Sequence, residues 1–364
     1  MLGSRDNMLI IIVILMMSFF YILYKTMKDS KNLIVEGNTF ESRRTLAKLG
    51  KYVNEVFAVS QSASINDLNL TSEQYKRQQA NREELKAALW LSGQGDREAK
   101  NFIIRFIQDI ITRPEIGITA ATIDEIVPFD DPDRMSGRYK LESLIFLWLR
   151  DHGQKGFSKM FSKYKLDVPK RTQYGKSYVV TDEEIDQVYR DYVETRGGIL
   201  YKEKIRMIAC FIYEDIIGNG AIELLQETDV DDVQFGVSGI PAGSYDITNT
   251  DHTDDMSYSF ESVWIVYHGL NIHLKCTTLG SQSELMRITR NVYRYKAPSN
   301  LSVNNPKVIG STKAGSRVMV AMPSFADSYV GIVRKFDSSP SADMSVLLRA
   351  ERPKMTEIEE EEVS

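Results

Sequence analysis

Cysteine and histidine are scarce in this chain, which holds 2 cysteines and 4 histidines among 364 residues. Cys210 lies within an apolar helical pattern and Cys276 follows a predicted strand, so they indicate neither a disulfide framework nor a zinc site. The histidines have no metal-ligand spacing with carboxylates or cysteines. His268 and His273 flank a predicted hairpin turn, where surface imidazoles are expected. We therefore predict no metal site.

An excess of positive charge is also missing. Lysine and arginine number 45 against 50 aspartates and glutamates, a net charge of -5. Without a dominant basic surface, no nucleic-acid partner is expected. Asp130, Asp131 and Asp133 lie close together in one segment. They are compatible with a divalent cation or with a solvated turn, and the lack of a second carboxylate cluster favours the turn.

No catalytic signature is present, and we predict no catalytic residue. Gly175-Lys176-Ser177 ends like a phosphate-binding P-loop, but a lysine stands where the first glycine belongs and a predicted strand follows. Gly218-Asn219-Gly220 begins like a dinucleotide fingerprint, but it follows a predicted helix and has Glu223 at the third glycine position. We interpret these glycines as the cap of that helix.

Long apolar runs are absent except near the N-terminus. Between Met8 and Tyr24 only Ser18 is neither apolar nor aromatic, which predicts a transmembrane helix over residues 8–24. Three lysines follow within the next few residues, so the positive-inside rule predicts a single-pass protein of the cell membrane, with its N-terminus outside and its bulk in the cytoplasm. A cleavable signal peptide is the alternative, but the run ends in bulky aromatics and lysines rather than small residues.

The remaining chain predicts an α+β protein. A polar stretch at 25–96 is expected to be a cytoplasmic linker or stalk, and 97–217 a helical domain, because apolar residues recur there at helical spacing. From 218 to 336, short apolar runs alternate with turn residues and predict a domain with a small mixed or antiparallel sheet. Residues 337–364 read as an acidic linker. The predicted strands are 233–237, 263–268, 271–275, 317–322 and 329–336, and the predicted helices include 139–151, 182–195, 200–217 and 281–295.

A series of short motifs runs through residues 213–336. Gly218-Asn219-Gly220-Ala221-Ile222-Glu223-Leu224-Leu225 precedes an aspartate-rich turn and a strand. Further on come Asn305-Pro306, Gly315-Ser316-Arg317-Val318, Ala321-Met322-Pro323-Ser324 and Ile332-Val333-Arg334-Lys335-Phe336. In this order and spacing they resemble the N-terminal domain of the secretion traffic ATPases, the hexameric motors of type II and type IV secretion, Tad pilus assembly and conjugation.

The resemblance implies a role for three cations. In that family, arginines of this domain reach the phosphates of the nucleotide held by the motor domain, so Arg317 and Arg334 are the expected contacts, with Lys335 as an ancillary charge. A guanidinium suits this task because its fixed fork of donors matches phosphate oxygens. The alternative is that these arginines satisfy sheet-edge carbonyls or an aspartate.

The motifs of the motor domain do not follow in these 364 residues. The chain alone is expected to bind no cofactor, although the resemblance implies ATP and magnesium, and ATP hydrolysis by this chain alone has no basis. We expect the membrane-anchored N-terminal part of a secretion or pilus-assembly ATPase, a coupling and oligomerisation module that forms a homo-oligomer, a hexamer in the family, and meets inner-membrane platform proteins. The alternative is a motorless membrane scaffold that recruits or regulates a partner ATPase.

Overall fold

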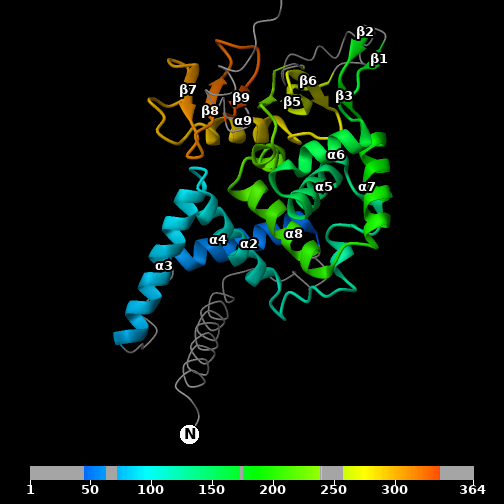
Figure 1. Ribbon diagram of the computed structural model, residues 1–364. Coiled ribbons are helices and arrows are strands. Elements are labelled where there is room, and N and C mark those ends of the chain that lie inside the picture. Colours follow the sequence, from blue (N-terminus) through cyan, green and yellow to red (C-terminus); the bar gives the residue numbers. More distant parts are fainter. Residues whose placement is uncertain (1–44, 63–71, 173–174, 238, 240–256, 337–364) are drawn as a thin grey trace, which may run out of the picture. The chain divides into compact units, whose positions relative to one another are not determined.

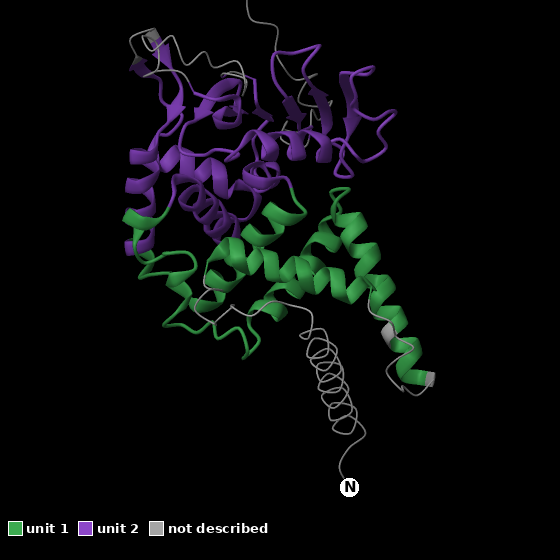
Figure 2. Cartoon of the chain, turned by 180° about the vertical axis from the view of Figure 1, so that it is seen from behind, with its two compact units in different colours: residues 1–135, 195–218 green, residues 136–194, 219–364 purple. Residues whose placement is uncertain are grey.

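The computed structural model describes residues 45–62, 72–172, 175–237, 239 and 257–336. The chain forms two compact units, each assembled from two separate stretches (Figure 2). Unit 1 contains residues 1–135 and 195–218, and unit 2 contains 136–194 and 219–364. Residues 97–217, which the sequence suggested as one helical domain, therefore contribute to both units.

The expected fold class needs a correction, because it included a membrane-spanning helix. Within the described ranges, no helix combines the length and the apolar composition that crossing a bilayer requires. The segment 8–24, where the span was expected, lies outside those ranges. The described chain is α+β, with helices and a mixed sheet.

Unit 1 is helical. Its apolar stripes explain its core: α4 buries Ile103, Ile107 and Ile110 on one face, and α8 packs against it with buried residues along almost its whole length. The side chain of Asp96 caps α4 by accepting a hydrogen bond from the backbone N–H of Ala99 at 2.8 Å. In the part of unit 1 that the structure describes, the helices are α2 (Leu46–Ser62), α3 (Ser72–Ser92), α4 (Arg97–Ile111) and α8 (Tyr201–Ile216), with short 3-10 turns η4 (Ile123–Glu125) and η5 (Pro132–Arg134).

A buried lysine ties the loop after α4 to α8. The Lys204 side chain is 5% exposed, and its Nζ lies 2.7 Å from Asp124 Oδ2 and 2.6 Å from Asp130 Oδ2. Asp130 is one of the three clustered aspartates of the sequence, and this ammonium neutralises it. Among the described residues, no group of three or more His, Cys, Asp or Glu side chains could hold a metal ion.

Unit 2 is built on a seven-stranded sheet in the order β3-β6-β5-β4-β9-β8-β7 (Figure 1). The pair β3–β6 is parallel and the other neighbours are antiparallel. The strands are β3 (Val179–Val180), β4 (Asp232–Phe235), β5 (Val263–Tyr267), β6 (Leu270–Leu274), β7 (Lys307–Ser311), β8 (Arg317–Ala321) and β9 (Val330–Arg334). A separate hairpin joins β1 (Lys170–Thr172) to β2 (Gly175–Ser177).

The two faces of the sheet differ in composition because side chains alternate along each strand. One face, the inner face, is fully buried: it carries Val233, Phe235, Val263, Ile265, Ile272, Leu274, Val318, Val320 and Val333. Two helices meet this face: α9 (Gln282–Asn291) contacts β9, and the Phe157 and Phe161 rings of α6 (Gly156–Tyr164) lie 6.1 and 5.5 Å from the Tyr267 ring. The other face, the outer face, carries mostly partly exposed and exposed side chains, with Ala321 as a buried exception.

Two further helices belong to the described residues of unit 2. Helix α5 (Gly137–His152) packs on α6, and α7 (Asp182–Arg196) contacts α5 through side chains. The rings of Trp148 and Tyr192 stack at 4.8 Å, and Lys140 Nζ pairs with Asp186 Oδ1 at 2.5 Å. The predicted hairpin turn is present between β5 and β6, where His268 (φ 49°) and Gly269 (φ 76°) adopt the two positive φ angles of a type I′ turn.

Candidate functional site

The two arginines expected at a phosphate are direct neighbours across two strands. Arg317 is the first residue of β8 and Arg334 the last of β9, and they stand opposite each other in the antiparallel register. Opposite residues project from the same face, with Cβ atoms about 5 Å apart. Both side chains are exposed, Arg334 at 69%. The fold therefore gathers two guanidinium groups at one end of the outer face.

Two further residues frame this pair. Asp232 of β4 stands opposite Arg334 on its other side, and Arg334 Nε lies 3.9 Å from Asp232 Oδ1. Burial raises the pKa of Asp232, while the charge of Arg334 opposes that rise. The Arg317 guanidinium carbon lies 5.1 Å from the centre of the Phe336 ring. Among the described residues, Arg317 has no ion pair and Asp232 Oδ1 has no hydrogen-bond partner.

Lys335 lies elsewhere. Its ammonium donates a hydrogen bond to the backbone carbonyl of Thr228, and its backbone N–H donates to the carbonyl of Asp231 at 2.8 Å. Successive residues of a strand point to opposite faces, so Lys335 turns away from the face that carries Arg334. It holds the end of β9 against the loop before β4 and does not join the arginine pair.

Next to the arginine row, the outer face carries an apolar and aromatic row. Ile309, Met319 and Ile332 stand opposite one another on β7, β8 and β9. Further along the same face, beyond β4, Trp264 and His273 stack with ring centres 4.3 Å apart. Burial lowers the pKa of His273 to about 4. Of the two histidines expected at the surface, only His268 is exposed.

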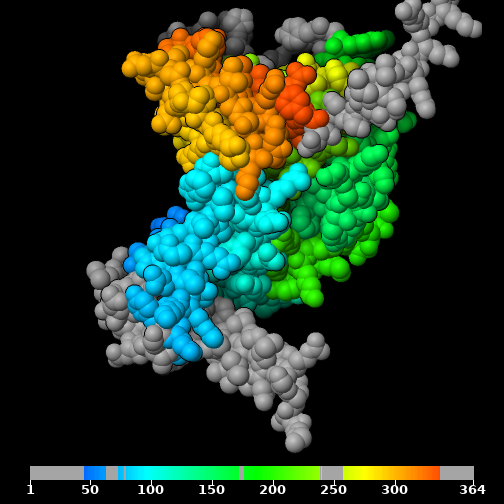
Figure 3. Space-filling model, turned by 60° about the vertical axis from the view of Figure 1, so that its left-hand side comes forward, coloured from blue at the N-terminus to red at the C-terminus, as the bar shows by residue number. Residues whose placement is uncertain are grey.

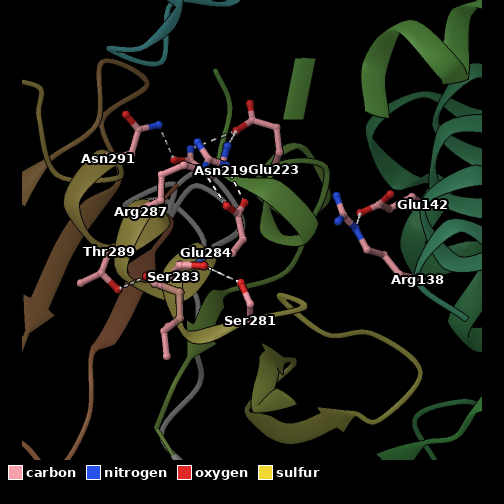
Figure 4. Close-up of polar contacts among 11 residues, drawn as sticks. Arg138, Glu142, Asn219, Glu223, Ser281, Ser283, Glu284, Arg287, Thr289 and Asn291 are labelled. Carbon is pink, nitrogen blue, oxygen red and sulfur yellow. Dashed lines mark hydrogen bonds and ion pairs between the residues drawn. The ribbon is translucent and has the colours of Figure 1, made fainter. Parts of the chain in front are cut away.

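The segment 218–223 has a structural role beside α9 (Figure 4). Asn219 donates from its backbone N–H and its side-chain amide to Glu223 Oε2, both at 2.9 Å, and accepts from Asn291 Nδ2 at 3.1 Å. Gly220 has φ 54°, and a Cβ there would lie 2.8 Å from Ile288 Cδ1 of α9. This glycine-containing turn therefore fits closely on a helix and leaves no place for a dinucleotide at this contact.

The other glycine motif is part of a hairpin. Gly175-Lys176-Ser177 forms β2, which pairs antiparallel with β1, and the exposed Lys176 stands opposite Arg171. A P-loop needs a helix start directly after its lysine, and β2 is instead followed by β3. The arginine pair with Asp232 and Phe336 thus remains the candidate site.

Neither a scan against models of protein families nor a search of curated proteins found a match for this chain. What bears on the role of the arginine pair is its chemistry and its place in the motif series of the sequence.

Proposed function

We propose that unit 2 is the N-terminal-type module of a bacterial secretion or pilus-assembly ATPase, which assembles with its motor domain and brings two arginines to the phosphates of the bound nucleotide. The observation that carries this proposal is the placement of Arg317 directly opposite Arg334 on the exposed face. The two residues come from separate motifs of the series, and the strand register unites them.

The chemistry of the pair supports an anionic ligand. Like charges directly opposite each other across two strands destabilise a sheet, and an anion between them removes that repulsion. Each guanidinium stays charged at all physiological pH values and offers a planar fork of N–H donors to phosphate oxygens. Among the described residues, Asp232 pairs with Arg334, at 3.9 Å, and Arg317 has no ion pair.

These residues suit a phosphate group and not its magnesium ion. Guanidinium groups only donate hydrogen bonds, and the part of the chain that the structure describes has no carboxylate, histidine or cysteine cluster that could hold a metal. In the proposed arrangement the motor domain supplies the P-loop and the magnesium site. Arg317 and Arg334 supply positive charge that stabilises the charge developing on the transferred phosphoryl group.

The first test is to sequence the gene beyond the codon for Ser364 and to assay ATP hydrolysis by the polypeptide that the whole reading frame encodes. Arg317→Gln and Arg334→Gln are each expected to lower kcat on the order of 10²-fold, because each removes a charge that acts on the transition state. The matched control is Arg171→Gln, which removes the same group from another exposed cross-strand pair of like charges, Arg171 and Lys176.

Three outcomes decide the proposal. An in-frame P-loop together with a loss of kcat in both arginine variants, and not in the control, supports it. A reading frame that encodes no motor leaves only a scaffold for a separate ATPase and overturns it. Equal kcat values in all variants of a motor-bearing polypeptide also overturn it.

A further inference from the structure

Strand β7 forms one outer end of the sheet, and its free side offers a row of backbone groups. Only β8 pairs with it among the described strands. Pro306 accepts from the Met322 N–H at 2.9 Å, and the Thr312 N–H donates to Ser316 at 2.8 Å. Hydrogen-bonded pairs alternate along an antiparallel ladder, so even-numbered residues here point their N–H and C=O groups at β8.

The odd-numbered residues of β7 therefore direct their backbone groups away from the sheet. These residues are Lys307, Ile309 and Ser311. An unpaired strand edge is a template for another strand, and proteins block such edges with prolines and charges. Pro306 does not block this one, because its nitrogen faces β8. Lys307 sits at one end, and its Nζ lies 4.8 Å from the Phe325 ring centre.

The side chains at this edge are unusually apolar for an exposed surface. Ile309 is 62% exposed and Met319 behind it is 38% exposed, although both lie within strands. With Ile332 they form a row on the outer face that runs up to the free edge and stops there. In Figure 3 the orange atoms of the segment with β7 and β8 belong to the surface that faces the viewer.

We infer that the free edge of β7 pairs with the same strand of a second copy of this chain. A two-fold axis at Ile309 places Ile309 opposite Ile309 and Lys307 opposite Ser311 of the other copy. All three outward residues of each copy then form hydrogen-bonded pairs, and no charge faces a like charge in the new pair of strands. A C2 contact of this kind requires such a self-complementary patch.

The same axis also extends the apolar row. Ile332, Met319 and Ile309 of one copy continue into Ile309, Met319 and Ile332 of the other, on the same face of one fourteen-stranded sheet, twice the seven strands of each copy. The sequence pattern thus fits a second copy in register. The contact is short, so the dissociation constant of the dimer is expected to be on the order of micromolar, as for other small interfaces. This inference does not depend on the proposed function.

A site-specific cross-link tests the register. In a hydrogen-bonded antiparallel pair the two Cα atoms lie about 5.5 Å apart, which suits a disulfide. Ile309→Cys in the full chain is therefore expected to form a disulfide-linked dimer under mild oxidation, at least tenfold more than Met319→Cys. Met319 is the control because the two copies of it would stand three strand spacings apart, about 14 Å. The native Cys210 and Cys276 are buried and do not compete.

Two further variants test the edge itself by sedimentation over a range of concentrations. Ile309→Pro removes an N–H that points away from β8, so the internal ladder keeps its hydrogen bonds while the edge loses its central donor. Ile309→Lys places two like charges across the axis. Both are expected to weaken the dimer at least tenfold. A wild-type monomer at all concentrations, cross-linking of the Ile309→Cys variant no greater than that of the Met319→Cys control, or a dimer unchanged in both edge variants would each overturn the inference.

Discussion

Gly331 of β9 is a position where a single added methyl group should strongly destabilise unit 2. A Cβ there would lie 2.1, 2.6 and 2.8 Å from three ring carbons of Phe235, the residue opposite it on β4. Ordinary contacts begin near 3.4 Å, so the ring must move by about 1 Å. Phe235 is fully buried on the inner face and has little room to do so. We expect Gly331→Ala to lower the free energy of unfolding by about 2–3 kcal/mol, the upper part of the overpacking range.

Urea unfolding followed by tryptophan fluorescence measures this loss. Trp148 and Trp264 lie in unit 2, whereas Trp90 in unit 1 is largely exposed, so the signal reports chiefly on unit 2. Phe235→Leu replaces the ring with a shorter side chain. In the double variant with Gly331→Ala it should restore at least about 1 kcal/mol of the free energy of unfolding, because contacting residues are energetically coupled. Leucine should not rescue the control Gly280→Ala, where φ is 82° and no atom lies within 4 Å of the new Cβ. Additive effects of the changes at 331 and 235 would refute the steric argument.

Three other perturbations have definite expected outcomes. Gly50→Ala in α2 should raise the free energy of unfolding by about 0.5–1 kcal/mol, because the residue is mid-helix and the new Cβ meets only Ile216 Cδ1 at 3.9 Å. A denaturant titration followed by circular dichroism measures this gain, and a lower free energy of unfolding would contradict the argument. Lys204→Met should lower the free energy of unfolding by about 2 kcal/mol. This is less than the loss of a fully buried ion pair, because Asp124 and Asp130 reach solvent. An unchanged melting temperature would show that these ion pairs do not contribute to stability. Burial lowers the pKa of His273 to about 4 in the folded protein. As the pH drops from about 6.5 to 4, the unfolded chain therefore binds a proton at His273 that the folded protein does not, and stability falls. His273→Gln should flatten the plot of melting temperature against pH over this range.

Local patterns in the sequence were enough to locate many elements. The alternation of apolar residues marked β5, β6, β8 and β9, and helices were located at 139–151 and 200–217, where α5 and α8 lie. The sequence did not predict strand β7, because Lys307–Ser311 contains a glycine and only two large apolar residues. The insertion of β9 between β4 and β8 depends on pairing between distant segments, which no local pattern encodes.

The candidate site, too, was predicted only in part from local sequence patterns. The motif series selected Arg317 and Arg334, but their direct opposition depends on the register of β8 against β9, which only the fold provides. Asp232 and Phe336 were not expected beside them, although Phe336 closes the last motif. Lys335 was expected with the pair, yet the period of two along a strand already places it on the opposite side from Arg334.

The interleaving of the two units also orders events during synthesis. The apolar face of α4 packs against α8, and about a hundred residues separate the two helices along the chain, among them the first segment of unit 2. At typical rates of translation, the ribosome needs on the order of ten seconds to deliver them. Throughout that interval α4 lacks its contact with α8, so part of its apolar surface is exposed to chaperones, and unit 1 cannot finish folding until the first segment of unit 2 has been synthesised.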